Sequence, residues 1–193
     1  MTRLFLALCL LLAPTATFAA DSKGDFAIRG LGRFACPQLL EAMEAKDARL
    51  NVFGAWVDGY ISALNQQSPG TFDAAPWQTT ELIVSLAGRR CAAEADANFH
   101  TIVGRILAEM RPLRLVERSD VVALRSGERV SPLYAEIVDR AKLRLTELGH
   151  RGADDDDQML GASIRAFQAD KNLPQTGLLD QQTLLNLFVR PKP

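Results

Sequence analysis

The chain has 193 residues, of which 22 are Lys or Arg and 23 are Asp or Glu, so its formal net charge is −1. This balance excludes the basic excess that is typical of proteins that bind nucleic acid or anionic membrane surfaces. The length allows one domain of ordinary size or two small ones.

Residues 1–20 have the pattern of a secretory signal peptide. Arg3 precedes a short apolar run from Leu4 to Leu12, and small residues lead to a predicted cleavage site after Ala20. The run is too short to span a bilayer core of ~30 Å, and no later stretch is long enough, so we expect no integral membrane segment. Cys9 lies within the apolar run rather than behind a small residue, which argues against a lipoprotein. We therefore expect a periplasmic or secreted protein.

Two cysteines, Cys36 and Cys91, remain after this cleavage. Two cysteines in an exported chain most often form a disulfide, and a closed loop of about 55 residues would add roughly 4 kcal/mol of stability in the chain-entropy model. The alternative is a pair of buried, inert thiols. A catalytic thiolate is not expected, because no histidine is near either cysteine in the sequence.

Residues 21–115 are predicted to form a helical, disulfide-bonded domain. Pro37 suits the first turn of a short helix, and apolar residues between positions 50 and 67 fall on one face of a second helix. A third helix is predicted from about Pro76 to about Arg90. A fourth is predicted to begin after Asp96, which would be its N-cap. No segment of this region shows the period-two alternation of a strand.

Residues 116–132 are predicted to be a connector. Their apolar residues follow no clear period, and Ser126-Gly127 and Ser131-Pro132 mark breaks. The segment is not polar enough, nor rich enough in Gly and Pro, to indicate disorder. We therefore expect it to be partly packed.

Residues 133–190 are predicted to form a small unit of three helices. An apolar stripe that ends at Leu148 is followed by Gly149, which suits a left-handed helix end. Further apolar stripes lie at positions 160–167 and 184–188, separated by turn residues. The fold class predicted for the whole chain is therefore all-α, a disulfide-tied helical bundle followed by this smaller domain.

The stretches Thr146–His150 and Ala166–Leu187 resemble the peptidoglycan-binding domain of bacterial cell-wall proteins, over roughly residues 134–189. The resemblance implies that Phe167 belongs to the core, that Gly177 forms a turn and that Asp180 with Thr183 caps the last helix. The full set of matching motif positions is Leu148, Gly149, Phe167, Leu173, Gly177, Asp180 and Thr183.

The resemblance is weaker in the loop before the second helix of this unit. His150 stands where the family has an aromatic residue, and Asp157 and Leu160 replace a glycine and a threonine. That loop borders the groove in which glycan or stem peptide is thought to lie in the family. The resemblance implies peptidoglycan as the ligand, and the polar candidates for binding it are Arg165, Gln168, Gln175 and Gln181.

The N-terminal region is similar to small periplasmic helical proteins of the HdeA-like acid-stress chaperone group. The shared features are Cys36, Cys91 and the run from Trp56 to Tyr60 that is followed by Leu64-Asn65. This resemblance implies a disulfide-bonded helical fold and says little about activity.

Three aromatic residues of this region, Trp56, Tyr60 and Trp77, have two interpretations. They could stack on sugar rings, but their helical spacing beside Leu64 is more typical of core positions.

The sequence predicts neither a metal site nor a cofactor. His100 and His150 are the only histidines, and zinc enzymes need clustered ligands. The acidic run Asp154–Asp157 lacks the glycine and glutamate of a helix-loop-helix calcium loop. We therefore expect a solvated loop that places Asp156 or Asp157 at the positive end of a helix, with calcium binding as the alternative.

The chain also lacks the sequence patterns of common hydrolases. It has no Gly-x-Ser-x-Gly elbow, no Ser-x-x-Lys motif and no Cys-His pair, so no catalytic residue is assigned. The sequence thus predicts a non-catalytic exported protein that binds peptidoglycan and localises its N-terminal domain at the cell wall. The alternatives are a periplasmic chaperone or immunity-type protein, and an accessory protein that activates a cell-wall hydrolase. These alternatives imply a periplasmic protein partner or a hydrolase partner.

Overall fold

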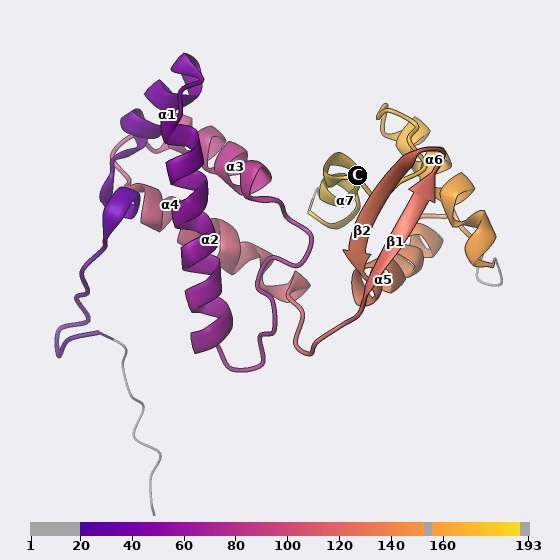
Figure 1. Cartoon of the computed structure of the whole chain (residues 1–193), viewed down its shortest axis with the longest axis horizontal. Helices are drawn as coiled ribbons and strands as arrows, with labels where there is room; N and C mark the ends of the chain where they lie inside the picture. The colour runs from indigo at the N-terminus through magenta and orange to yellow at the C-terminus, as the bar shows by residue number, and fades with distance from the viewer. Residues whose placement is uncertain (1–19, 153–155, 190–193) are drawn as a thin grey trace, which may run out of the picture.

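The computed structural model of the chain describes residues 20–152 and 156–189. The predicted signal peptide up to residue 19 and residues 153–155 of the acidic run lie outside the described residues. Within them the chain forms two helical lobes, the second of which carries a β-hairpin (Figure 1). The N-terminal lobe contains α1 (Cys36–Ala45), α2 (Arg49–Gln67), α3 (Thr80–Ala93), α4 (Phe99–Met110) and the 3-10 helices η1 (Gly30–Arg33) and η2 (Arg111–Leu113). The C-terminal lobe contains β1 (Val121–Ser126), β2 (Arg129–Tyr134), α5 (Ala135–Glu147), the 3-10 helix η3 (Asp157–Met159), α6 (Leu160–Asp170) and α7 (Gln181–Phe188).

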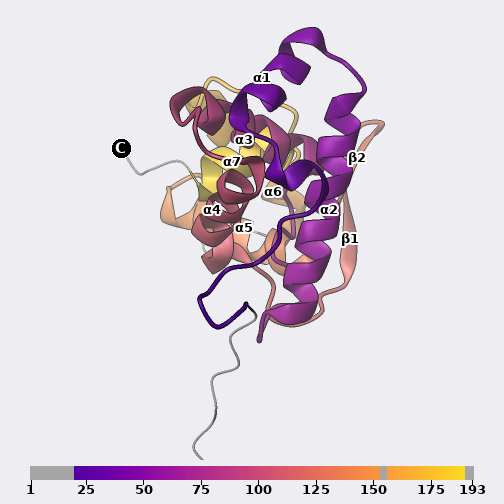
Figure 2. The same ribbon diagram turned by 90° about the vertical axis from the view of Figure 1, so that its left-hand side faces the viewer.

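The N-terminal lobe is organised around α3, which contacts α1, α2 and α4. Seen from this end of the molecule, the long α2 runs along one side of the lobe (Figure 2). Phe53 and Phe99 are both almost fully buried, and their rings meet edge to face with centroids 4.8 Å apart. Each helix thus contributes apolar side chains to one continuous core, as the predicted helix faces require.

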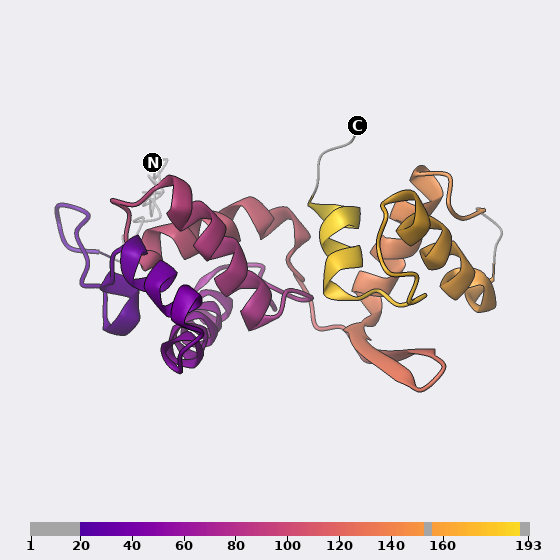
Figure 3. The same ribbon diagram turned by 90° about the horizontal axis from the view of Figure 1, so that it is seen from above.

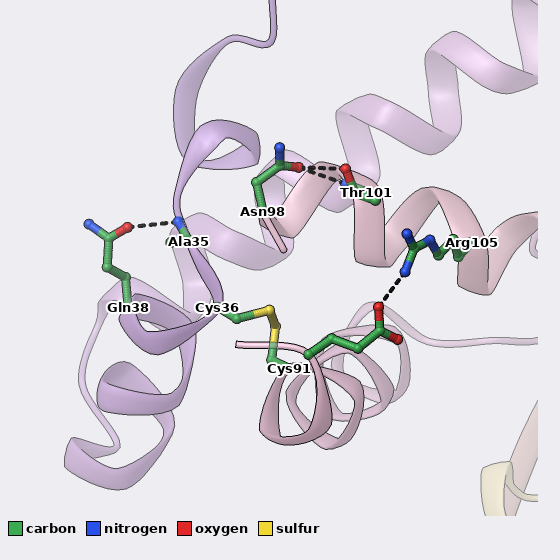
Figure 4. Close-up of a disulfide and its surroundings, with 8 residues drawn as sticks. Ala35, Cys36, Gln38, Cys91, Asn98, Thr101 and Arg105 are labelled. Carbon is green, nitrogen blue, oxygen red and sulfur yellow. Dashed lines mark hydrogen bonds and ion pairs between the residues drawn. A yellow bond between two sulfur atoms is a disulfide. The ribbon is translucent and has the colours of Figure 1, made fainter. Parts of the chain in front are cut away.

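The predicted disulfide between Cys36 and Cys91 is confirmed. It joins the first residue of α1 to the last part of α3, with Cα atoms 4.9 Å apart and a sequence separation of 55 (Figure 4). Both cysteines have no exposed surface. The bond therefore links α1 to α3 inside the core of the lobe.

The predicted N-cap of α4 at Asp96 is wrong. The helix begins two residues later, where the side chain of Asn98 accepts a hydrogen bond of 2.9 Å from the backbone N–H of Thr101 (Figure 4). Asn98 is held extended, because Cys36 donates to the carbonyl of Ala97 and Phe99 donates to the carbonyl of Phe34. These contacts come from the distant N-terminal segment, which helix-cap rules do not consider.

The connector predicted over residues 116–132 contains most of an antiparallel β-hairpin. Val121 pairs with Tyr134 and Ser126 with Arg129, which leaves Gly127 as the first of two loop residues. Its φ of +60° suits the first position of a type II′ hairpin turn. The hairpin projects from the helices (Figure 3), most of its residues are exposed, and Leu133 is the one buried residue of its strands, so burial imposes little alternation of apolar residues. The chain is thus mostly helical with one small sheet.

The C-terminal lobe packs α6 and α7 against α5. Two of its helices end in the same hydrogen-bond pattern. Gly149 has a φ of +77° after α5, where His150 donates to the carbonyl of Leu145. Asn172 has a φ of +53° after α6, where Leu173 donates to the carbonyl of Gln168. A left-handed residue at this position lets the backbone N–H groups beyond a helix bond its last free carbonyls.

The two lobes meet at Trp77, which precedes α3 instead of starting it as predicted. Its side chain is 4% exposed and packs in the core of the C-terminal lobe, with its ring centroid 5.9 Å from that of Phe188. Leu115, which follows η2, is buried in the same cluster. None of the helices in the described part of the chain combines the length and hydropathy of a membrane span.

Candidate functional site

A cationic surface lies where the first half of α6 meets the turn before α7. Arg165 is exposed and has no acidic partner within the described parts of the chain. Its guanidinium group lies over Gly177, because a Cβ atom built on that glycine would be 2.4 Å from Nη1. The same group is 3.8 Å from a Cβ built on Gly161. The arginine therefore lies across the turn in space that a side chain at position 177 would occupy, whereas its distance from Gly161 is that of an ordinary contact.

Gly177 is fixed by its backbone as well as by this contact. Its φ is +68°, a conformation that residues with a Cβ rarely adopt. The neighbouring Gln175 is exposed and lies on the same turn. Arg165 and Gln175 are thus the two predicted ligand-binding residues whose side chains are accessible to a ligand.

The prediction that Gln168 binds the ligand is wrong, because this side chain has no exposed surface. Its Nε2 donates to the hydroxyl of Thr183 at 2.8 Å and to the carbonyl of Leu178 at 3.1 Å. Its Oε1 accepts from the backbone N–H of Gly177 at 2.9 Å. A buried amide must find such partners, and these partners tie α6 to the turn and to α7. Gln168 therefore holds the turn and α7 in place beneath the surface, and it is not itself accessible to a ligand.

The same polar network includes the cap of α7. Asp180 accepts hydrogen bonds from the backbone N–H and the hydroxyl of Thr183, and from the hydroxyl of Thr176. Phe167, which is fully buried, packs beneath this network. The structure therefore gives the motif residues Phe167, Gly177, Asp180 and Thr183 the core, turn and cap positions that the resemblance implies.

Gln181 also does not point toward a ligand. Its Nε2 donates to the carbonyl of Trp77, and its Oε1 accepts from the backbone N–H of Thr79 at 3.0 Å. Both ends of its amide are engaged by the N-terminal lobe. The prediction that Gln181 binds peptidoglycan is therefore replaced by a role in holding the lobes together.

His150 occupies the aromatic position of the motif and behaves as an aromatic residue. Its ring meets that of Phe167 edge to face, with centroids 5.4 Å apart. Its Nε2 is 3.8 Å from a carboxylate oxygen of Asp170, and hydrogen bonding from Lys171 holds the pKa of that carboxyl below its ordinary value. His150 therefore contributes to packing at the end of α5.

The described part of the acidic loop acts as a helix cap. The carboxylate of Asp156 accepts a hydrogen bond of 3.1 Å from the backbone N–H of Met159, in the short helix that precedes α6. Asp154 lies outside the described residues. Over residues 20–152 and 156–189, no three His, Cys, Asp or Glu side chains are grouped as metal ligands.

The aromatic residues of the N-terminal lobe separate into two environments. Trp56 stacks on Tyr60 with ring centroids 5.2 Å apart, and its indole N–H donates to the carbonyl of Arg29 at 2.9 Å. His100 lies against both rings, and burial lowers the pKa of its imidazole. Trp77, by contrast, is a core residue at the boundary between the lobes.

Two residues important to these arrangements were not assigned their roles from the sequence. Gly161 lies under Arg165, and a glycine in the first turn of a predicted helix is the signal that could have identified it. Trp77 was interpreted as the start of the third N-terminal helix. It lies before α3, which begins at Thr80, and belongs to the core of the C-terminal lobe. The sequence does not specify which surface either residue contacts.

Comparison with known families identifies the C-terminal lobe. The family described as "Putative peptidoglycan binding domain" matches residues 135–187, which run from the start of α5 almost to the end of α7. The match shows that this lobe is similar to peptidoglycan-binding domains, and it supports peptidoglycan as a partner. No curated protein and no solved structure matches the chain. The similarity of the N-terminal lobe to HdeA-like proteins therefore stays a prediction.

Proposed function

We propose that the chain is a non-catalytic exported protein whose C-terminal lobe binds peptidoglycan and holds the N-terminal lobe at the cell wall. The observation that carries this proposal is the family match over residues 135–187. The export signal predicted over residues 1–20 is part of the proposal, and it agrees with a ligand that lies outside the cytoplasm.

Arg165 and Gln175 are the proposed contact residues. An exposed guanidinium group without an acidic partner can donate charge-assisted hydrogen bonds to carboxylates and carbonyls of stem peptides. The exposed amide of Gln175 both donates and accepts, which suits the hydroxyl and amide groups of a glycan strand. So small a surface implies weak binding at one site, and a repeating ligand compensates by avidity.

Sedimentation with purified sacculi tests the proposal. The wild-type chain should be retained, and Arg165→Ala should weaken retention by about tenfold, which corresponds to the loss of one charge-assisted hydrogen bond. Gln175→Ala should weaken it less. Arg89→Ala is the matched control, because Arg89 is an exposed arginine on α3 in the other lobe.

Point variants are preferable to removal of the C-terminal lobe, because truncation would uncover Trp77 and Leu115. A well-folded wild-type chain that remains in the supernatant would overturn the proposal. Equal losses for Arg165→Ala and Arg89→Ala would overturn the assignment of the contact residues.

The absence of catalysis is tested separately. The purified chain should leave the turbidity of a sacculus suspension unchanged over a period in which a known muramidase clears it. Clearing by the wild-type chain alone would contradict the non-catalytic part of the proposal and leave the binding part intact.

A further inference from the structure

A pocket that is separate from the surface around Arg165 lies in the N-terminal lobe. It opens between α2, α4 and the loop that follows α2, and its volume is about 270 Å³. Leu64 and Leu107 supply much of its apolar lining. Gly104 lines it without a side chain, and the hydroxyl of Tyr60 lies 3.4 Å from where a Cβ atom on that glycine would be.

Two hydroxyl groups of this pocket lack partners. In the described chain, no hydrogen bond is made by the hydroxyl of Tyr60, and the hydroxyl oxygen of Thr71 is buried without a partner. The hydroxyl of Thr71 is enclosed, whereas that of Tyr60 lines the pocket and is open to a polar ligand atom. Burial raises the pKa of the Tyr60 phenol, which leaves it a hydrogen-bond donor at neutral pH.

Two arginines give the pocket its charge. Arg114 donates to the carbonyls of Gly70 and Arg111, which holds its guanidinium group in place. The side chain of Arg111 lines the pocket and forms no ion pair within residues 20–152 and 156–189. No Asp or Glu is among the described residues that line the pocket.

From these features we infer that the pocket binds a carboxylate attached to a short apolar group. The carboxylate bonds to Arg111 and to the free N–H groups of Arg114, and the hydroxyl of Tyr60 completes its hydrogen bonding. The apolar part lies against Leu64 and Leu107. The volume, at the lower end of the range for small-molecule sites, suits a group about as large as a dipeptide.

Two sources supply this chemistry: the C-terminus of a peptide that ends in small residues, and a short acyl chain. Both present one carboxylate beside a few apolar carbons. A ligand of this size should bind with a dissociation constant on the order of 1 mM. The site lies in the N-terminal lobe, so it does not depend on whether the C-terminal lobe binds the wall.

NMR titration of the full chain tests the inference with three probes: N-acetyl-Ala-Ala, its C-terminal amide and hexanoate. The backbone amides of Thr71 and Gly104 should shift with at least one of the two carboxylates, while the amide of Gly177 in the other lobe should not. The C-terminal amide of the peptide should bind about tenfold more weakly than the acid, because it lacks the charge. Tighter binding of the peptide acid identifies a peptide end as the source, and tighter binding of hexanoate identifies an acyl chain.

Two variants separate this site from general surface binding. Arg111→Gln should weaken binding about tenfold, while the matched control Arg89→Gln should not change it. Ala108→Leu places a larger side chain at the pocket mouth, and Ala108 is exposed, so the core is not disturbed. It should abolish the shifts without lowering the melting temperature. Equal binding of acid and amide, unchanged binding by Arg111→Gln, or no shift with either carboxylate would each overturn the inference.

Discussion

Gln181, at the start of α7, donates a hydrogen bond to the backbone carbonyl of Trp77, a residue 104 positions earlier in the chain. The other end of the same amide accepts from the N–H of Thr79. One side chain thus bonds the C-terminal lobe to the backbone that leads into α3. The indole ring of Trp77 in turn packs in the core of the C-terminal lobe.

We predict that Gln181→Ala loosens the contact between the lobes without reducing retention on sacculi. The two backbone groups are only partly buried, so water replaces the lost partner and the cost should be about 1 kcal/mol. Urea unfolding should become less cooperative, with separate transitions for the two lobes. Gln182→Ala, a substitution at the exposed neighbouring position, is the control. A large loss of retention with Gln181→Ala would instead return Gln181 to the ligand-binding residues.

A second prediction concerns Gln168. Gln168→Leu keeps a similar volume but leaves the N–H of Gly177 and the carbonyl of Leu178 without partners inside the lobe. The free energy of unfolding should fall by about 2–4 kcal/mol, because each buried, unpaired group is costly. Chemical denaturation followed by Trp77 fluorescence in a Trp56→Phe background measures it, since this indole lies in the C-terminal core.

The matched control for this variant is Gln182→Leu, because Gln182 is exposed on α7. It should leave the free energy of unfolding nearly unchanged. Similar stability of the two leucine variants would contradict the structural role of Gln168.

A third prediction concerns the disulfide. The double variant Cys36→Ala/Cys91→Ala should lose about 4 kcal/mol in free energy of unfolding, because the unfolded chain is no longer constrained by its 55-position loop. Urea denaturation followed by Trp56 fluorescence, in a Trp77→Phe background shared with the disulfide-intact reference, measures the loss in the N-terminal lobe. The C-terminal lobe contains no part of that loop and should keep its own stability. A change of equal size in both lobes would indicate that the disulfide also supports their interface.

A fourth prediction concerns pH. Burial lowers the pKa of His100 below its ordinary value of 6.5, so the unfolded chain binds a proton more readily than the folded chain. The stability contributed by the neutral ring is therefore complete above pH 6.5 and decreases as the pH falls below it. Below pH 6.5, and down to about pH 5, the free energy of unfolding should decrease more steeply in the wild type than in His100→Phe.

The phenylalanine variant keeps an aromatic ring among Phe26, Trp56 and Tyr60, so the comparison isolates the charge. An NMR titration of the His100 ring that gives a pKa at or above the ordinary value would contradict this prediction.

The helices of this fold are predictable because their apolar faces follow helical spacing. The faces of α2 and α4 carry Phe53 and Phe99 into one core, and the cystine joins the first residue of α1 to α3. The hairpin was not predictable in this way. Its valines at positions 121, 122 and 130 are exposed, and Leu133 is the one buried residue of the two strands, so little alternation is left in the sequence.

The candidate site was predictable in part. A polar side chain in a helix is normally assigned to the surface, and this assignment holds for Arg165. It fails for Gln168 and Gln181, because their partners are backbone groups of a turn and of a distant loop. Sequence shows that such a residue can form hydrogen bonds, but only the fold determines whether its partners are internal.

Gly177 determines where the charge of Arg165 lies, although it has no side chain of its own. Any larger residue there would displace the guanidinium group from the turn. When other chains with this domain are compared, the glycine therefore tells more than the arginine about where the positive charge lies. A chain that keeps the arginine but lacks the glycine places its guanidinium group farther from the turn.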